Sequence, residues 1–439
     1  MRKQLIMNKI FLLLLFLNSF AYSQTWEKTF PDAEVGVCVN QTNDNGYIVL
    51  GSYYDSGLVT YLLKTDNSGN KEWSQSFFGS STGWGNLMSL YPRSVHQTSD
   101  GGFIICCYSS GTGSQSGTTI LIKTDLNGLI EWEQEFNNNP GNTSFNTTAS
   151  YAQQTSDGGY IIVGYSNSSN NTFLIKTNSF GIEQWVQHYT NHIYPTFVEQ
   201  TNDGGFIISG RDFTNDYFSL LKSDVNGIQQ WQKNYNYGSN SITTSCQQTN
   251  DGGYVLTGYN GASNTNPYGD DLYLIKTDNN GNEQWANTFG LSQKKDQGFS
   301  VQQTNDGGYI ITGLKDEDVN TEPKLYLLKT DNNGNEQWSK SFGQYNTIIM
   351  DTIGEGYSVR QTNDGGYIVA GETINALYLL KVDNNGNLTS VFNYTNINEN
   401  VKLDYLLDFS GKIINRPVMI PFIEIYRSGK SKKKFILKQ

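Results

Sequence analysis

The chain has little of what catalytic and metal sites are usually built from. It contains only three histidines and four cysteines, and charged residues make up 16% of its length. It has no Gly-x-Ser-x-Gly elbow, no P-loop and no Cys-x-x-Cys pair. His188 and His192 lie four residues apart in a segment without helical periodicity, where that spacing does not favour a shared metal ion. We therefore expect no catalytic residues, no metal ligands and no cofactor.

Positive charge is also scarce, since the formal net charge is −11. This balance argues against nucleic acid or anionic lipid as a partner. Long apolar runs are absent after the N-terminus. Residues 1–23 combine early cations, the apolar run Phe11–Leu17 and the small-residue ending Ala21-Tyr22-Ser23. This pattern predicts a secretory signal, because the run is shorter than the ~20 residues that span a bilayer.

The sequence does contain a repeat of 46 to 58 residues that begins with a Gln-Thr pair. A polar-Asp-Gly-Gly segment follows the pair (Asn-Gly in the first copy), and these residues favour tight hairpin turns. Two apolar runs come next, then a turn such as Asp331-Asn332-Asn333-Gly334-Asn335, then a run containing tryptophan. The glutamines of the seven copies are Gln41, Gln97, Gln154, Gln200, Gln248, Gln303 and Gln361.

Each repeat therefore predicts four strands joined by turns. The two middle runs are apolar on consecutive residues, which indicates a sheet covered on both faces. A covered four-stranded sheet that recurs at this period is typical of a propeller blade. We predict an all-β, seven-bladed β-propeller of four-stranded antiparallel blades over residues 24–395.

The tryptophan run predicts how the ring closes. Six repeats carry the tryptophan, the last repeat has Ser390 instead, and an orphan run Trp26–Phe30 precedes the first repeat. We expect this N-terminal strand to complete the last blade. Large aromatic rings at this position would dock one blade against the next; they are Trp26, Trp73, Trp132, Trp185, Trp231, Trp285 and Trp338.

Two sets of residues are candidates for ligand contact. The strand order places the constant turns at one end of the ring and the variable loops at the other, and recognition usually resides in variable loops; the alternative is that these loops drift without selection. Their aromatic candidates are Trp84, Tyr91, Tyr268 and Tyr345. The residue before each Gln-Thr pair varies but stays polar. It would either contact a ligand in the channel or form a solvated lining of the channel. These residues are Asn40, His96, Gln153, Glu199, Gln247, Gln302 and Arg360.

The four cysteines are predicted to be small core residues. Cys38 and Cys246 fall on inner runs of distant repeats, too far apart for a bridge. Cys106 and Cys107 are adjacent, and a disulfide between them is the alternative.

The C-terminal tail resembles a known family of export signals. The segments Asp408–Ile414 and Phe422–Tyr426, followed by the basic ending Lys432–Lys438, are similar to the C-terminal sorting domain of type IX secretion cargo in Bacteroidetes. The match covers about 40 residues and lacks the family's early Pro-Asn-Pro region. It implies that residues 396–439 are a small β-structured sorting segment, recognised by the type IX machinery. The protein would then be secreted or displayed on the outer-membrane surface.

The repeat itself resembles one common in exported Bacteroidetes and archaeal proteins of unassigned function. Its Lys-Thr-Asp-x-x-Gly-Asn-x-x-Trp segment is also similar to the tryptophan-docking motif of pyrroloquinoline quinone dehydrogenases, where adjacent cysteines lie against the cofactor. Those enzymes usually have eight blades, and the cysteine pair lies elsewhere here. We expect a monomeric, non-enzymatic binding module for protein or glycan. The alternatives are a quinone-dependent oxidoreductase and a purely structural surface protein.

Overall fold

The computed structural model describes residues 25–79, 88–110, 117–136, 147–166, 171–190, 193–238, 240–261, 270–291, 294–317, 323–343, 353–373, 376–388, 403–408, 413–414 and 422–426. The chain divides into two compact units, Met1–Leu388 and Thr389–Gln439. The described residues form strands and turns and no helix, so no helix among them is long and apolar enough to cross a membrane. The prediction of an all-β chain is confirmed.

Each repeat forms a four-stranded antiparallel sheet, and we number the repeats 1 to 7 by their Gln-Thr pairs. The strands of repeats 1 to 3 are β2 (Val35–Gln41), β3 (Tyr47–Tyr54), β4 (Leu58–Thr65), β5 (Lys71–Phe77), β6 (Leu90–Gln97), β7 (Phe103–Ser109), β8 (Thr118–Thr124), β9 (Ile130–Phe136), β10 (Thr147–Gln154), β11 (Tyr160–Ser166), β12 (Asn171–Thr177) and β13 (Glu183–Tyr189). Those of repeats 4 to 6 are β14 (Ile193–Gln200), β15 (Phe206–Asp212), β16 (Tyr217–Ser223), β17 (Gln229–Tyr235), β18 (Ser241–Gln248), β19 (Tyr254–Asn260), β20 (Asp271–Thr277), β21 (Glu283–Phe289), β22 (Asp296–Gln303), β23 (Tyr309–Lys315), β24 (Lys324–Thr330) and β25 (Glu336–Phe342).

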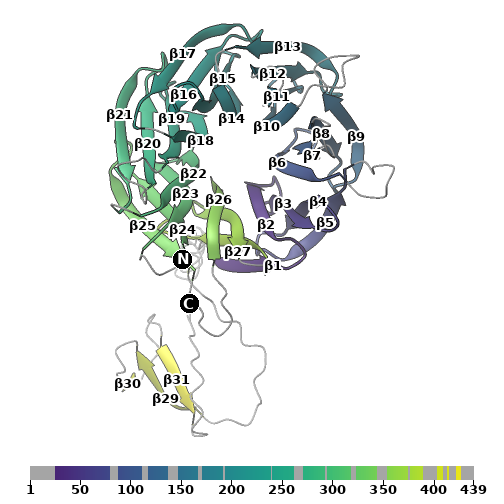
Figure 1. The fold of residues 1–439 in the computed structure, drawn as a ribbon. Helices are drawn as coiled ribbons and strands as arrows, with labels where there is room; N and C mark the ends of the chain where they lie inside the picture. The colour runs from purple at the N-terminus through teal and green to yellow at the C-terminus, as the bar shows by residue number, and fades with distance from the viewer. Residues whose placement is uncertain are drawn as a thin grey trace, which may run out of the picture. The chain divides into compact units, whose positions relative to one another are not determined.

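Repeat 7 takes its fourth strand from the other end of the chain. Its own strands are β26 (Ile353–Gln361), β27 (Tyr367–Thr373) and β28 (Leu377–Val382), and β1 (Trp26–Phe30) pairs antiparallel with β28. The predicted pairing of the N-terminal strand with the last repeat is confirmed. A single residue pair, Val35–Glu372, joins this sheet to that of repeat 1. In Figure 1 the sheets of this unit stand around a central opening, and β1 lies at the edge of the sheet of repeat 7, next to the first repeat.

The two middle strands of each repeat are buried, as their continuous apolar runs predict. In β11 every residue is buried, and in β12 only the first is not. The inner strand of each repeat carries a β-bulge three residues before the polar residue that precedes the Gln-Thr pair, for example at Ser150 in β10, three residues before Gln153. Because successive strands are antiparallel, all Asp-Gly-Gly turns and all Asn-Gly turns lie at one end of the ring. We call this the turn end, and the opposite end the loop end.

Tryptophans on the outer strands dock each repeat against the next. The ring of Trp73 lies 5.8 Å from that of Phe103, edge to face, and covers Gly128 of the same neighbouring repeat. Gly128 has a φ of +78°, and a Cβ there would lie 2.6 Å from the indole, so both the turn and the packing require glycine. The corresponding ring pairs are 5.6–6.0 Å apart throughout: Trp26–Tyr47, Trp132–Tyr160, Trp185–Phe206, Trp231–Tyr254, Trp285–Tyr309 and Trp338–Tyr367.

The glutamine of every Gln-Thr pair also links its repeat to the preceding one. The side-chain oxygen of Gln97 accepts a hydrogen bond from the backbone N–H of Asn43, in the turn of repeat 1. Six more bonds of this kind, at 2.8–2.9 Å, follow around the ring, and the last of them, from Asn363 to Gln41, joins repeat 7 to repeat 1. The constant glutamine is therefore a structural residue.

A buried lysine fastens the Asp-Gly-Gly turn of each repeat. Lys123 is 3% exposed and forms an ion pair with Asp100 at 3.0 Å. That aspartate also accepts hydrogen bonds from Thr98 and from the backbone N–H of Gly102. The same lysine–aspartate pair occurs in the other six repeats at 2.8–3.0 Å. These contacts account for the constant threonine, aspartate and lysine of the repeat.

The C-terminal unit contains one small sheet among its described residues. Its strands are β29 (Leu403–Asp408), β30 (Ile413–Ile414) and β31 (Phe422–Tyr426), in the order β30-β29-β31 with antiparallel pairing. The apolar runs of the tail thus form strands.

Candidate ligand-binding channel

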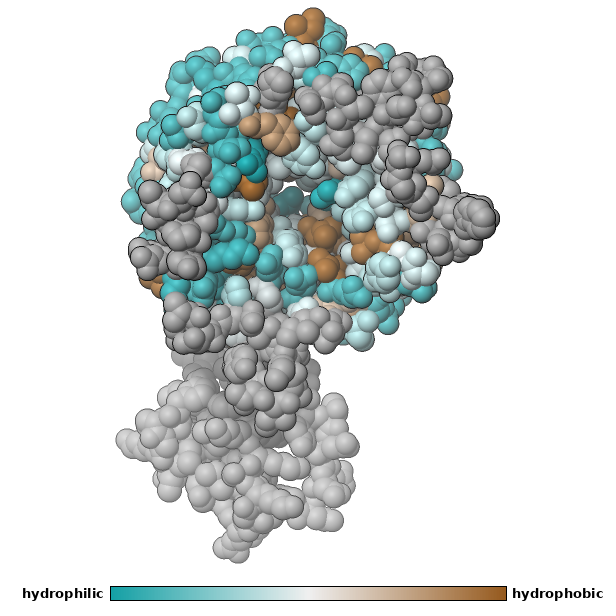
Figure 2. All heavy atoms as spheres, viewed as in Figure 1, coloured by the Kyte–Doolittle hydropathy of each residue, from teal (hydrophilic) through white to brown (hydrophobic). Residues whose placement is uncertain are grey.

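The residue before each Gln-Thr pair is partly exposed in all seven repeats, whereas the residue before it is at most 3% exposed. This alternation follows from the strand geometry, since successive side chains point to opposite faces. The polar side chains therefore project away from the inter-sheet core, on the side of the central opening. Figure 2 shows that opening as a hollow whose wall is apolar on one part and polar on the rest.

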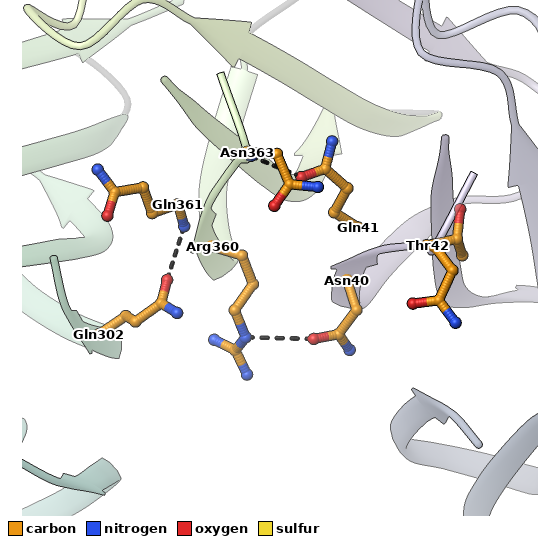
Figure 3. A pocket seen from close by; sticks show the side chains of 8 residues that line it. Asn40, Gln41, Thr42, Gln302, Arg360, Gln361 and Asn363 are labelled. Atoms are coloured by element: carbon orange, nitrogen blue, oxygen red, sulfur yellow. Dashed lines mark hydrogen bonds between the residues drawn. The ribbon is translucent and has the colours of Figure 1, made fainter. Parts of the chain in front are cut away.

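Three of the seven predicted channel residues meet in one pocket. Asn40, Gln302 and Arg360 line a cavity of about 350 Å³ at the turn end, together with Gln41, Thr42, Asn43, Gln361 and Asn363. The Nε of Arg360 donates to the Oδ1 of Asn40 at 3.3 Å, and the Asn40 amide donates to the carbonyl of Val95 at 2.6 Å. Figure 3 shows the Arg360 guanidinium extending beside Asn40, with Gln302 on its other side. The pocket lies at the junction of repeats 6, 7 and 1.

Three channel residues accept hydrogen bonds across the junction with the next repeat. Glu199 accepts from the backbone N–H of Gln248 at 2.7 Å, Gln247 from that of Gln303 at 2.7 Å, and Gln302 from that of Gln361 at 2.6 Å. These residues thus have a role in joining the repeats besides lining the channel.

Two channel residues have strongly shifted pKa values. Burial raises the pKa of Glu199 to about 7, although the N–H of Gln248 and the charge of Arg360 act in the opposite direction. Burial, and secondarily Arg360, lowers the pKa of His96 to about 3. The His96 ring packs edge to face on Tyr151 at 5.4 Å, and its Nε2 has no hydrogen-bond partner among the described residues. The histidine is therefore neutral at physiological pH, and the carboxyl titrates there.

Of the predicted loop aromatics, only Tyr91 lies in the described part of the chain. Trp84, Tyr268 and Tyr345 lie outside it. Tyr91 stacks on Tyr108 with ring centroids 4.6 Å apart and an interplanar angle of 8°. The Arg93 guanidinium lies 4.8 Å from the centre of the Tyr108 ring. These three residues form a partly exposed aromatic and cationic group at the loop end of the channel.

Other aromatic groups at the loop end were not predicted. Phe299 and Tyr357 stack at 5.5 Å across the junction of repeats 6 and 7. Tyr194 packs against Tyr165 and Phe213, and the Phe213 side chain is 41% exposed. A signal was available, because Phe299 and Tyr357 occupy the bulge position of their inner strands, where most repeats have a smaller side chain.

The cysteines are core residues, as predicted. All four are buried and free. Cys106 and Cys107 are consecutive in β7, so their side chains enter different inter-sheet cores. Burial raises the pKa of Cys107 to about 12, so its thiol is unreactive.

The Asn-Gly turns are closed by their own side chains. The Oδ1 of Asp278 accepts hydrogen bonds from the backbone N–H groups of Asn280 and Asn282, and its Oδ2 accepts from the Asn282 amide. These bonds lower the pKa of the carboxyl. The turn is thus a side-chain-capped turn of the kind aspartate and asparagine favour.

No protein-family model matches the chain, and no curated protein matches it. Solved structures do match its fold. The WD40 domain of Neurospora crassa Pan2 superposes with a TM-score of 0.50 at 12% identity, over 84% of this chain and 98% of that domain. A streptogramin B lyase gives 0.49 at 10% identity, over 82% and 98%. YCF48 bound to D1 peptide gives 0.45 at 9% identity, also over 82% and 98%.

WD40 repeats form β-propellers, in which four-stranded blades surround a central channel. The sheets of this chain have the same strand number and arrangement. The chain therefore has a β-propeller fold. Structural similarity at such low sequence identity supports a shared fold but not a shared function.

Proposed function

We propose that this chain is an exported, monomeric, seven-bladed β-propeller that binds a protein or glycan at its loop end and catalyses no reaction. The blade count is supported by the seven inter-repeat glutamine bonds and by the pairing of β1 with β28. The binding role is supported most by the contrast between the two ends of the ring.

At the turn end, the constant glutamine, threonine, aspartate and lysine of each repeat are engaged in contacts within the ring. At the loop end, aromatic side chains that differ between repeats remain partly exposed around the channel. Among these are Tyr91, Phe213 and Phe299. Rigid aromatic rings provide large contact areas at small entropic cost, both for proteins and for the apolar faces of sugars.

A screen of the purified chain against glycan arrays and extracellular proteins would test this role. We expect Phe213→Ala and Tyr91→Ala to weaken whatever binding is found by about tenfold, the effect of losing one well-packed ring. The matched control is Phe180→Ala, because Phe180 is 68% exposed in an Asn-Gly type turn at the turn end. Equal loss in all three variants would contradict a binding site at the loop end.

We further propose that residues 396–439 direct export through the type IX machinery, giving release or display on the outer-membrane surface. The support is the resemblance of the tail to the sorting domain, together with the separate β-sheet formed by β29, β30 and β31. Deleting residues 401–439 should retain a folded propeller in the periplasm. Cell fractionation measures this, and normal export of the truncated chain would contradict the proposal.

A further inference from the structure

The pocket at the turn end lies where the pattern of inter-repeat hydrogen bonds changes. At three of the seven junctions, which are consecutive, an acceptor oxygen from the channel residue of one repeat accepts a hydrogen bond from the backbone N–H of the glutamine in the next. At the junction of repeats 7 and 1 the channel residue is Arg360, whose side chain has five N–H donors and no acceptor. Arg360 therefore cannot accept from Gln41 in the way that Gln302 accepts from Gln361.

The N–H of Gln41 is oriented like that of Gln361. Gln41 pairs with Tyr47 as Gln361 pairs with Tyr367, and both sit at the end of the inner strand just before the Asp-Gly-Gly or Asn-Gly turn. Gln41 lines the pocket beside Arg360. Gln41 with its backbone donor and Arg360 with its guanidinium thus both line this pocket.

Arg360 forms no direct ion pair with a carboxylate of the described residues, and the one channel carboxyl on which its charge acts, Glu199, has a pKa raised to about 7 by burial. The Arg360 side chain is only partly exposed, and it donates to neutral groups: the side chain of Asn40, the hydroxyl of Ser300 and the carbonyl of Val359. A partly buried cation without a counter-ion is unfavourable. An anion in the pocket would provide the missing partner.

The remaining wall of the pocket indicates what else the anion carries. Besides Arg360, the lining consists of asparagine, glutamine and threonine, without an apolar or acidic side chain. The amides of Gln41 and Gln361 are already bonded within the ring. The amides of Asn43, Gln302 and Asn363 remain in whole or in part, and such groups present donors and acceptors that match the hydroxyl groups of a sugar. The volume of about 350 Å³ falls within the range of about 300–1,000 Å³ typical of small-molecule sites.

We propose that this pocket binds a sugar acid, with its carboxylate on the guanidinium of Arg360 and the N–H of Gln41 and its hydroxyls on the surrounding amides. The site is separate from the loop end and does not depend on the binding role proposed there. It lies at the opposite end of the channel.

Calorimetric titration of the purified chain with glucuronate and galacturonate, against glucose and galactose, tests the ligand class. We expect the uronates to bind at least about tenfold more tightly than the neutral sugars, because charge-assisted bonds are about twice as strong as neutral ones. Inorganic phosphate is the third probe. If it binds as tightly as the uronates, the sugar-acid assignment is overturned in favour of a general anion site, and equal binding of neutral sugars overturns it as well.

Arg360→Gln should reduce uronate affinity by about tenfold or more. The control is Arg93→Gln, because Arg93 lies on the inner strand of repeat 2 toward the loop end and should leave the affinity unchanged. Asn43→Ala provides a second variant in case Arg360→Gln fails to fold. It removes a lining side chain but keeps the backbone bond to Gln97, and we expect a several-fold loss. Unchanged affinity in folded Arg360→Gln and Asn43→Ala proteins would refute the site.

Discussion

Replacing Glu199 by glutamine should stabilise the propeller at neutral and alkaline pH. Burial raises the pKa of the Glu199 carboxyl from 4.5 to about 7 in the folded chain. The neutral carboxyl therefore favours the folded state below about pH 4.5, and this contribution is lost as the pH rises to 7. Because one pKa unit corresponds to about 1.36 kcal/mol, the loss is roughly 3 kcal/mol above pH 7.

Glutamine keeps the structural role of this side chain. Gln247 and Gln302 accept the equivalent backbone hydrogen bond in the next two repeats at 2.7 and 2.6 Å. Urea denaturation of the wild type and Glu199→Gln at pH 4.5, 6, 7 and 8, followed by tryptophan fluorescence, measures the difference in unfolding free energy. We expect near-equality at pH 4.5 and an advantage of the variant approaching roughly 3 kcal/mol at pH 8.

The difference in unfolding free energy between the variant and the wild type reports on Glu199 alone, because the other titrating groups are present in both proteins. His96, whose folded-state pKa is lowered, contributes a slope of the opposite sign below about pH 6.5, and it is the same in both proteins. If the variant and the wild type have parallel stability profiles between pH 5 and 8, Glu199 is not a buried titrating group and the reasoning fails.

Three further substitutions test the contacts that hold the ring together. Trp26→Ala should reduce the free energy of unfolding by about 3 kcal/mol in urea titrations, since it empties the docking site between β1 and repeat 1. Asp203→Asn should also cost about 3 kcal/mol by the same measurement. It leaves the ammonium of Lys222 buried, and Asp203 is the one carboxylate paired with Lys222 among the described residues. Leu129→Asn should leave the free energy of unfolding unchanged or raise it by up to about 1 kcal/mol. Leu129 is 58% exposed, and the asparagine at this position of other repeats donates to the turn aspartate at 2.9 Å.

Each of these substitutions has a matched control within the repeats. Trp132→Ala should cost about as much as Trp26→Ala, but only the latter should accelerate amide hydrogen exchange in β28; equal exchange would contradict a role for Trp26 in closure. Asp44→Asn should cost less than Asp203→Asn, because Lys64 keeps Glu72 at 2.8 Å, and equal losses would argue against the ion-pair account. A loss of more than about 1 kcal/mol in Leu129→Asn would show that the exposed leucine has a structural role.

The strands and their pairing could be predicted from sequence because the same pattern of apolar runs and turns recurs in every repeat. Consecutive apolar residues predicted the buried middle strands, and the tryptophan missing at Ser390 together with the early Trp26 predicted the pairing of β1 with β28. The roles of Gln97 and Lys123 were not predicted, although their recurrence in every repeat was a signal. Gln97 contacts the neighbouring repeat, and Lys123 contacts the turn of its own sheet 23 residues earlier in the chain. Neither partner is adjacent in sequence, so local patterns alone could not reveal it.

The candidate site was harder to predict because it depends on differences between repeats. The inner position was identified as polar and variable, yet nothing in the sequence indicated that Asn40, Gln302 and Arg360 would share one pocket. Asn40 and Arg360 are separated by almost the whole propeller in sequence, and they meet only because the ring closes between repeats 7 and 1. The loop-end stack of Phe299 and Tyr357 likewise crosses a junction between repeats.

The position of Arg360 gives the pocket its significance. Three of the seven channel residues, Glu199, Gln247 and Gln302, accept a backbone hydrogen bond from the next repeat. Asn40 and His96 do not make this bond. Arg360 places a cation instead of an acceptor at the junction of repeats 7 and 1. Departures from a locally consistent pattern concentrate at functional sites. Arg360 is the one charged cation among the seven channel residues, because the pKa of His96 is lowered to about 3. An anionic ligand would supply the direct counter-ion that no described carboxylate gives it.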